Sequence, residues 1–480
     1  MLNKCHTTLF ILVIIALSCI AESTNGVREN PRQKRSPKPQ FPKFIYRPFA
    51  KLISKVIPKV HKKGVKFVSD NPGKIVGGGA AVAVVSVAAA GIGKKRPRPG
   101  CEVYIRHLKE KQPVFLDIGA LMIPVDGYLN WNVGDKSWIA CPSSSDQMNS
   151  INGLYRVSAE IECVGGHIFK YVHNSHIINI TNVYCDQRAT GNVRRDSNIQ
   201  CPGSYKAVGF NVSFPIIGYK FFDLYHLCFN ESAATTVYTT HTLYGNEISH
   251  KCYSSKPQFK SAGFSHRNIS WAYNIAWQKD ELTNLFRSYP NETNPQGSTD
   301  DYYNLSNLQR GHLNPDADQL FTTWQWSTYF YINVVGMWQQ INNGNWKNLE
   351  NNVRTLAANS SKTYKIYTGT FDTLSLCSRA ENCPKFTLSD GRIPVPKWLW
   401  KIVKFPELDA AIALVVSNNP FVHVNPICSL GGESYGWNST INSNLTRGAV
   451  SYCAVNDLMR VVPTIPSEAL ANNILSFEVS

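Results

Sequence analysis

No two cysteines in this sequence have the Cys-x-x-Cys spacing that is typical of structural zinc sites. The chain has 13 cysteines in 480 residues, and Cys5 and Cys19 fall in an N-terminal leader, which leaves 11. We therefore expect disulfide bonds and an oxidising compartment rather than thiolate-bound metal. The odd number predicts one free or intermolecular thiol.

The N-terminus lacks an apolar run long enough to be a membrane anchor. Lys4 precedes the apolar stretch Leu9–Ile20, and small and polar residues follow it. Since a membrane-spanning helix needs about 20 apolar residues, we expect residues 1–23 to be a secretory signal peptide. Residues 32–36, Arg-Gln-Lys-Arg-Ser, resemble a furin-type processing site. Residues 24–35 are therefore either a short propeptide or an ordinary basic linker.

Secretion would expose the chain to glycosylation. We expect a secreted, extracellular glycoprotein in which several of nine Asn-x-Ser/Thr sequons carry glycans. The sequons are at Asn179, Asn211, Asn230, Asn268, Asn291, Asn304, Asn359, Asn438 and Asn444.

The main body of the chain has no excess charge, although the whole chain has a formal net charge of +16. Residues 27–100 contain 18 Lys and Arg against two acidic residues, and residues 101–480 contain 30 basic and 30 acidic residues. A body of this kind that binds nucleic acid must concentrate its cations locally or use the basic arm for attraction.

Residues 36–100 form this basic arm, which we expect to be disordered or amphipathic. Lysines recur through residues 51–66 among apolar residues at roughly helical spacing, and an Ala/Val/Gly run follows from Val76 to Gly93. This composition resembles cecropin-type membrane-active peptides of insects. Residues 36–96 could contact an anionic membrane surface, hold nucleic acid, form a transmembrane helix, or act as an inactive linker.

Residues 101–255 contain no internal repeat and no long amphipathic helical pattern. Short runs of β-branched and aromatic residues alternate with turns, for example in residues 153–161, 177–183 and 208–217. Cysteines are interspersed with these runs at positions 101, 141, 163, 185, 201, 228 and 252. We expect a β-rich region supported by disulfides, with pairings that the sequence does not determine.

Chemically suggestive residues concentrate between Gln309 and Arg354. His312 follows a glycine and could serve as a general base. Asn342 offers a neutral amide oxygen suited to a largely hydrated Mg²⁺, and Glu350 could hold a water bound to the metal. Arg310 and Arg354 could bind phosphate oxygens through two N–H groups each.

The spacing of apolar residues predicts an amphipathic helix over residues 345–358. Trp346, Leu349, Val353 and Leu356 recur at intervals of three and four, so they should form one buried stripe. Glu350 and Arg354 would lie one turn apart beside it. A β-like run in residues 329–332 should end at Asn333, and residues 277–286 also have a helical pattern.

The order of these motifs resembles the DNA/RNA non-specific endonuclease family, closest to its secreted arthropod branch that degrades double-stranded RNA and DNA. The similarity rests on Arg310-Gly311-His312, Asn333, and the segment Asn342-Asn343-Gly344-Asn345-Trp346 with Leu349-Glu350. It continues through residues 367–370 and 393–403. The resemblance is strong over residues 260–460, weak over 101–260 and absent before 100.

The resemblance implies a ββα-metal site with Mg²⁺ as cofactor and Mn²⁺ as a substitute. It implies cleavage to 5′-phosphate and 3′-hydroxyl ends, and contact with DNA and RNA through the phosphate backbone. The implied roles are general base for His312, magnesium ligand for Asn342, water-holding carboxylate for Glu350, site amide for Asn333, and phosphate binding for Arg310 and Arg354.

Two positions depart from the family pattern. Gln309 stands where many members have Asp, so an orienting role of that carboxylate is lost. Residues 334–337, Val-Val-Gly-Met, replace a more polar segment that would contact substrate. A further family arginine corresponds to Arg287 or Arg267, and a glycan on Asn304 would have to point away from the cleft.

We therefore expect an α+β protein whose ββα-metal nuclease core, with a mixed antiparallel sheet, occupies residues 256–480. The β-rich region 101–255 and the arm 36–100 precede it. The expected function is a secreted, metal-dependent endonuclease with little sequence specificity. The alternative is a secreted nucleic-acid-binding or membrane-active protein, antimicrobial or venom-like, with weak or no nuclease activity.

Overall fold

The computed structural model describes residues 100–480 apart from residues 118, 144–147, 197–198, 216–217, 263, 265–268, 289–305, 377–383, 390–391, 432–433 and 478–480. The chain divides into two units at residue 90, and the described residues all lie in the second, Gly91–Ser480. The expected signal peptide, the candidate propeptide and the arm up to residue 99 lie outside the described residues, as do three of the sequons. Within the described part of the chain, no helix is long and apolar enough to cross a membrane.

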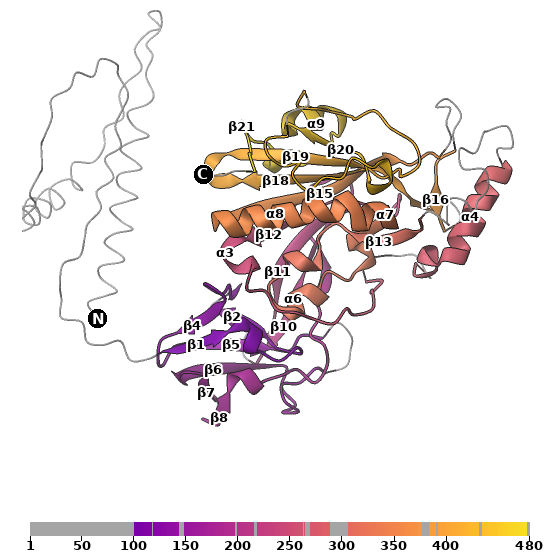
Figure 1. Ribbon diagram of the computed structural model, residues 1–480. Helices are drawn as coiled ribbons and strands as arrows, with labels where there is room; N and C mark the ends of the chain where they lie inside the picture. The colour runs from indigo at the N-terminus through magenta and orange to yellow at the C-terminus, as the bar shows by residue number, and fades with distance from the viewer. Residues whose placement is uncertain are drawn as a thin grey trace, which may run out of the picture. The chain divides into compact units, whose positions relative to one another are not determined.

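The β-rich character expected after residue 100 is confirmed (Figure 1). A two-stranded antiparallel sheet pairs β1 with β4, and a six-stranded antiparallel sheet has the order β3-β2-β5-β6-β7-β8. Their strands are β1 (Cys101–Tyr104), β2 (Val114–Asp117), β3 (Ala120–Leu121), β4 (Tyr128–Trp131), β5 (Lys136–Ala140), β6 (Ser158–Gly165), β7 (Ile168–Tyr171) and β8 (Ile177–Asn179).

Disulfides link these strands, as the cysteine content predicts. Cys101 is bonded to Cys163 and Cys141 to Cys185. Two further bonds join Cys201 with Cys228 and Cys428 with Cys453. Cys252 is a buried free thiol, which accords with the odd number of cysteines.

A larger sheet of nine strands forms the centre of the second unit, in the order β20-β19-β18-β15-β12-β11-β10-β9 with β21 beside β19. Its strands are β9 (Asn192–Arg195), β10 (Ser204–Phe214), β11 (Gly218–Asn230), β12 (Thr235–Tyr244), β15 (Thr363–Thr373), β18 (Pro396–Phe405), β19 (Ala410–Ser417), β20 (Val450–Cys453) and β21 (Asn473–Ile474). All pairs are antiparallel except β19 with β21, so the sheet is mixed. Because β12 pairs directly with β15, the sheet joins strands from both sides of the domain boundary expected at residue 255.

The two faces of this sheet are covered by different segments. Side chains alternate along β12, so His241 faces α8 (Lys347–Ser360) whereas Tyr238 faces the opposite side. On that opposite side, Tyr238 belongs to a buried cluster that includes residues of α9 (Val455–Val461). Figure 1 shows α8 and α9 on different sides of β15 and β18.

The helix that bears Glu350 and Arg354 has the expected buried stripe. In α8, Leu349, Val353 and Leu356 are buried against the sheet, as the three- and four-residue spacing predicts. The α-helix begins two residues later than expected, because the π-helical turn η6 (Asn342–Trp346) is kinked at Gly344, whose backbone angles are not helical. It ends at Ser361, whose left-handed backbone closes the last turn.

Shorter elements complete the fold. The remaining α-helices are α3 (Gly245–Ile248), α4 (Ile275–Ser288), α6 (Thr322–Trp326) and α7 (Gln339–Ile341). Two short hairpins consist of β13 (Leu308–His312) with β14 (Val334–Trp338), and β16 (Thr387–Leu388) with β17 (Ile393–Pro394). Single 3₁₀ turns are η1 (Ile105–His107), η2 (Ile180–Asn182), η3 (Trp271–Tyr273), η4 (Asp316–Asp318), η5 (Tyr331–Asn333), η7 (Pro406–Leu408), η8 (Leu445–Arg447) and η9 (Ser467–Ala469). Helix α4 contains the helical pattern expected for residues 277–286.

Candidate active site

The hairpin of β13 and β14 presents Arg310 and His312. These residues are two positions apart on a strand, so they project to the same face. Gly311 between them lies opposite Val335, and a Cβ atom added to it would come within 2.3 Å of the Met337 Sδ atom. The glycine therefore lets the backbone that carries His312 pack closely against β14.

His312 is set among aromatic rings. Its ring centroid is 4.9 Å from that of Tyr329 and 5.3 Å from that of Phe259. Burial lowers the pKa of the imidazole to about 4, while the nearby Asp316 carboxylate opposes this shift and Lys256 adds to it. The Nε2 atom is buried and has no hydrogen-bond partner among the described residues. A neutral imidazole with an unpaired ring nitrogen is suited to accept a proton from water.

Asn333 is a buried support for the chain that follows His312. Its Nδ2 atom donates 2.8 Å hydrogen bonds to the backbone oxygens of Asn314 and Thr328. Its Oδ1 atom accepts one of 3.0 Å from the Asn314 backbone N–H. These bonds use both amide hydrogens, and Asn333 has no exposed surface.

The prediction of a β-like run that ends at Asn333 is wrong. Residues 331–333 form the 3₁₀ turn η5, and β14 begins only at Val334. The physical reason is the hydrogen bond from the Asn333 side chain to Thr328, together with a backbone bond from Asn333 N–H to Phe330, which close the segment into a turn.

Asn342 lies at the start of the π-helical turn between α7 and α8. Its Nδ2 atom donates a 3.2 Å hydrogen bond to Gln309 Oε1 on β13. The amide nitrogen is thereby directed to Gln309, and the amide oxygen remains available as a ligand for a cation. Gln309 lacks the family's carboxylate, but its own amide oxygen supplies an orienting contact. The carboxylate is absent, as the sequence shows, and the position contacts Asn342 through an amide instead.

Buried contacts fix the π-helical turn itself. Asn345 is fully buried, and its Nδ2 atom donates to the backbone oxygens of Asn442 and Gly448 at 2.8 and 2.7 Å. A Cβ atom on Gly344 would meet backbone and side-chain atoms of Arg447 at 3.0 Å. The turn that carries Asn342 is thus anchored to residues 442–448.

Arg354 is engaged by protein groups in the structure. Its Nη1 atom donates to Asp318 Oδ1 at 2.7 Å, and its Nη2 atom donates to Asn351 Oδ1 at 2.7 Å. The other oxygen of Asp318 lies 3.0 Å from His241 Nε2. Burial by itself would raise the pKa of Asp318, but the hydrogen bond from His241 and the charge of Arg354 hold it below its usual range. These two bonds use two of the five N–H groups of the guanidinium.

Glu350 lies one turn before Arg354 on α8. Burial raises the pKa of its carboxyl group to about 7, while Lys401 and Arg354 oppose this shift. Lys401 is itself buried, and its Nζ atom donates a 2.7 Å hydrogen bond to Thr368 Oγ1. Near neutral pH, the Glu350 carboxyl group is therefore partly ionised and partly protonated. The ionised form accepts a hydrogen bond from water, and the protonated form can donate one to water.

Arg310 lies among three aromatic rings. Its guanidinium carbon is 5.1 Å from the ring centroid of Tyr273, 5.5 Å from that of Phe259 and 5.6 Å from that of Tyr331. Its Nη2 atom donates to Ser270 O at 3.4 Å, and its buried Nε atom has no described partner. These ring contacts restrict the guanidinium while leaving N–H groups for an anion.

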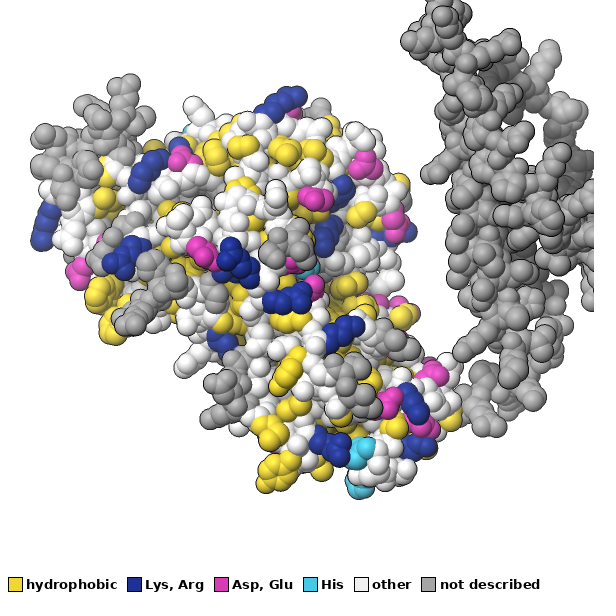
Figure 2. Space-filling model, turned by 180° about the vertical axis from the view of Figure 1, so that it is seen from behind, with side chains coloured by type: hydrophobic (Ala, Val, Ile, Leu, Met, Phe, Trp, Pro, Cys, Tyr) yellow, Lys and Arg dark blue, Asp and Glu magenta, His cyan; other side chains and the backbone are white. Residues whose placement is uncertain are grey.

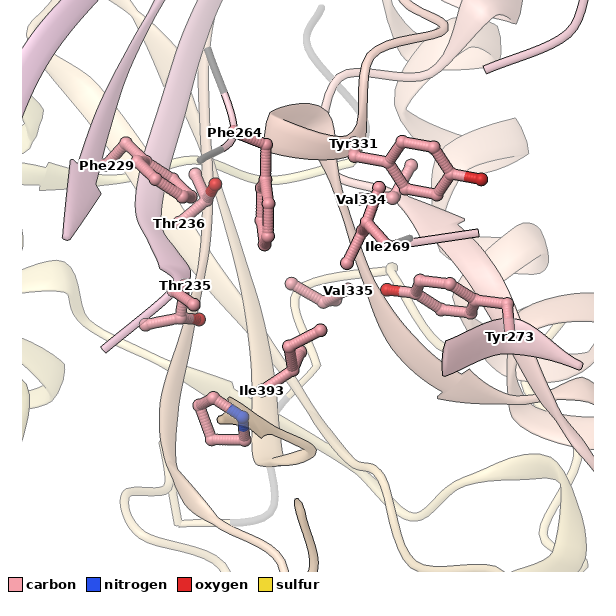
Figure 3. A pocket seen from close by; sticks show the side chains of 12 residues that line it. Phe229, Thr235, Thr236, Phe264, Ile269, Tyr273, Tyr331, Val334, Val335 and Ile393 are labelled. Atoms are coloured by element: carbon pink, nitrogen blue, oxygen red, sulfur yellow. The ribbon is translucent and has the colours of Figure 1, made fainter. Parts of the chain in front are cut away.

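A small cavity lies behind this hairpin, between Tyr273, Tyr331 and Val335 (Figure 3). Its volume of about 10 Å³ is enough for one water molecule at most. This cavity is therefore too small to hold a nucleotide. Figure 2 shows Lys and Arg side chains spread over the visible face as separate groups, several of them beside acidic ones.

The residues present offer a magnesium ion one suitable oxygen ligand, that of Asn342. No group of three or more His, Cys, Asp or Glu side chains arranged to hold a metal occurs in the described ranges. A hydrated Mg²⁺ needs few protein ligands, and the oriented Asn342 oxygen is a hard donor of the required type. Asn342, with Glu350 to hold a coordinated water, is thus the candidate cation site.

Several functional contacts were missed by sequence reasoning. Asp318 lies six residues after His312, but nothing in the sequence indicates that it contacts His241 or Arg354. Phe259 belongs to no recognised motif, and Lys401 lies in the segment 393–403 that resembles the family, but no role was assigned to it. Arg287 lies in the last turn of α4, and Arg267 is outside the described residues.

Comparison with known proteins adds independent evidence. The sequence model of the DNA/RNA non-specific endonuclease family matches residues 206–444. The chain is 27% identical over 366 residues to a salivary endonuclease of Lutzomyia longipalpis, covering 73% of this chain and 80% of that protein. It is 30% identical over 140 residues to a nuclease of Nostoc sp., covering 28% of this chain and 46% of that protein.

Among solved structures, a crystal structure of the EndoG/EndoGI complex is similar at a TM-score of 0.26 and 16% identity, over 42% of this chain and 75% of that one. The family match includes the β13–β14 hairpin, the π-helical turn and α8, which together carry the candidate site. The chain belongs to the DNA/RNA non-specific endonuclease family, whose members are metal-dependent hydrolases.

Proposed function

We propose that the protein is a secreted, Mg²⁺-dependent endonuclease in which His312 is the general base and Asn342 holds the metal ion. The observation that carries this proposal is the buried, unpaired Nε2 atom of His312 on the same strand whose Gln309 orients Asn342. The low pKa of His312 keeps the base neutral at physiological pH. Mn²⁺ should substitute for Mg²⁺, since both prefer oxygen ligands.

In the proposed reaction, His312 Nε2 takes a proton from a water molecule. The water oxygen attacks phosphorus in line with the P–O3′ bond, which breaks and leaves a 5′-phosphate and a 3′-hydroxyl. When bound, the metal ion would supply positive charge for the phosphoryl oxygens and the departing 3′-oxygen. Glu350 holds a water molecule in place, and the 3′-oxygen takes its proton from solvent or from such a water.

The two arginines have different proposed roles. Arg310 has N–H groups free of carboxylate partners among the described residues, so it binds phosphate oxygens. Arg354 is committed to Asp318 and Asn351, so we assign it to positioning α8. Asn333 holds the chain after His312 and does not contact substrate.

Substrate contacts should be mainly to the phosphate backbone of DNA and RNA. This predicts low sequence specificity and cleavage that weakens as salt rises. Residues 101–480 carry balanced charge, so the basic arm is proposed to add attraction to nucleic acid or to an anionic surface. The leader sequence and the salivary relative support secretion.

A cleavage assay on single- and double-stranded DNA and RNA tests this proposal. The purified full chain should cleave these substrates with Mg²⁺ or Mn²⁺ and not with EDTA. End-labelling should find 5′-phosphates on the products. Intact substrates across a range of both metals would refute the enzymatic assignment, and 3′-phosphate products would refute the proposed bond cleavage.

A further inference from the structure

The central sheet has a large cavity on the face opposite α8. Its volume is about 510 Å³, within the range of about 300–1,000 Å³ that is usual for small-molecule pockets. Strands β10, β11, β12 and β15 form its floor, and residues 463–468 and 199–202 also line it. The disulfide between Cys201 and Cys228 ties the second of these segments to the sheet.

Aromatic rings dominate the floor of this cavity. Tyr205, Tyr238 and Tyr367 line it, and each is at least nine-tenths buried. The ring of Tyr205 stacks on that of His226 with centroids 5.4 Å apart and planes inclined by 20°. Strand register explains the grouping, since Tyr238 pairs with Cys228, and Tyr367 pairs with Thr240. Such rings offer stacking surfaces for a planar aromatic ligand.

Two polar groups in the cavity have no protein partner. Thr240 is 6% exposed, and its buried Oγ1 atom has no hydrogen-bond partner in the described part of the chain. Lys365 is half-buried, and no described carboxylate forms an ion pair with its ammonium group. Burial lowers the pKa of Lys365. A buried hydroxyl and an unpaired ammonium group are both suited to bind a polar, anionic part of a ligand.

The remaining charged lining residue lies at the edge of the cavity. Glu468 is exposed, whereas its backbone oxygen accepts a 3.3 Å hydrogen bond from the Tyr367 hydroxyl. Its carboxylate is therefore able to remain in solvent when the cavity is filled. The cavity combines aromatic rings with the ammonium group of Lys365, which attracts the anionic part of a ligand, while burial and the charge of Glu468 help to raise the pKa of all three tyrosines.

We propose that this cavity is a second ligand site that binds a nucleoside 5′-monophosphate, with the base against the tyrosine rings and the phosphate on Lys365. The choice of a nucleotide rests on the proposed function, because the proposed endonuclease releases products whose ends carry 5′-phosphates. The existence of the pocket does not depend on it. The site is separate from the candidate active site, since Thr240 and His241 are adjacent on β12 and face opposite sides of the sheet.

Calorimetric titration of the full chain with 5′-dAMP and with deoxyadenosine, in EDTA, tests the site. Both ligands should bind saturably, and the nucleotide should bind more tightly. Lys365→Met should weaken 5′-dAMP at least ~10-fold while changing deoxyadenosine less than ~2-fold, because only the phosphate contact is lost. Tyr238→Leu should weaken both ligands.

Lys362→Met is the matched control, because Lys362 is an exposed lysine just before the same strand. It should bind both ligands as the parent does. Thermal unfolding of each variant checks that the fold is kept. Lack of saturable binding by the parent at ~10 mM, or equal 5′-dAMP affinity in Lys365→Met and parent, would overturn the proposal. Because binding is measured without metal, this result is independent of whether the chain cleaves nucleic acid.

Discussion

Gln309 Oε1 accepts a 3.2 Å hydrogen bond from Asn342 Nδ2, and this contact joins the strand of the proposed base to the proposed metal ligand. The donor and acceptor are both side-chain amides, so the contact needs no charge. It fixes which atom of Asn342 faces a cation, because the nitrogen is occupied. An orienting partner of this kind acts on metal affinity rather than on the chemical step.

Replacing Gln309 with Leu should raise the Mg²⁺ concentration for half-maximal cleavage by about 10- to 100-fold, with a smaller effect at saturating metal. Gln309→Glu keeps an acceptor and should retain most of the affinity. Asn343→Ala serves as the control, because this exposed neighbour makes only a 3.5 Å contact with Gln309. Metal titration of cleavage rates measures each effect. An unchanged metal requirement in Gln309→Leu would mean that Asn342 needs no such orientation.

Removal of the proposed base should separate catalysis from binding. His312→Ala should lower the cleavage rate by about 10²- to 10⁴-fold, since general base catalysis contributes that much. Affinity for a double-stranded oligonucleotide, measured by fluorescence anisotropy in EDTA, should stay close to that of the parent. The exposed His423 gives the control His423→Ala, which should cleave normally. Parental rates in His312→Ala would show that another group is the base.

The pH dependence of stability should also report on His312. Its pKa is lowered to about 4 by burial, so unfolding takes up a proton between that value and the usual value near 6.5. The folded state therefore loses stability as pH falls through this window, and nothing is lost above it. Urea unfolding in EDTA should show a smaller loss between pH 7 and pH 5 in His312→Gln than in the parent.

The exposed His423 again provides the comparison, and His423→Gln should follow the parent at both pH values. If His312→Gln and the parent lose equal stability, the imidazole is not kept neutral by burial. The measurement needs no substrate and no metal, so it is independent of catalysis.

The buried pair of Arg354 and Asp318 should matter for stability far more than a surface pair of the same kind. Asp318 is 4% exposed, and its removal leaves the charge of Arg354 beneath α8 without a carboxylate partner. Asp318→Ala should lower the free energy of unfolding by about 3–5 kcal/mol. Asp457→Ala breaks the exposed 2.8 Å pair with Arg460 and should cost at most about 1 kcal/mol. Urea denaturation measures the free energy of unfolding of both variants. Similar losses in the two variants would contradict the prediction that the buried pair contributes more.

Several features followed from the sequence because they depend on local spacing. The buried stripe of α8 follows from Leu349, Val353 and Leu356, since a helix places residues three and four apart on one face. The strand that carries His312, the disulfides and the odd thiol were also predicted correctly. The family was recognisable because its motifs have fixed order and spacing within about fifty residues of chain.

Other features required the tertiary structure, because they join residues far apart in the chain. The sequence predicts that Asn333 ends a strand, but its hydrogen bonds to Asn314 and Thr328 make it part of a turn. The sequence gives no sign that Arg354 pairs with Asp318, or that Asp318 in turn contacts His241. Neither contact has a periodic signature.

The sequence by itself determined the family, the secondary structure around His312 and the residue types available for chemistry. Only the tertiary structure decided which of those residues face one another. The physical reason is that pairing of β12 with β15 and of β13 with β14 depends on long-range strand register. That register sets His241 beneath α8, Gln309 against Asn342, and the tyrosines of the second cavity on the opposite face.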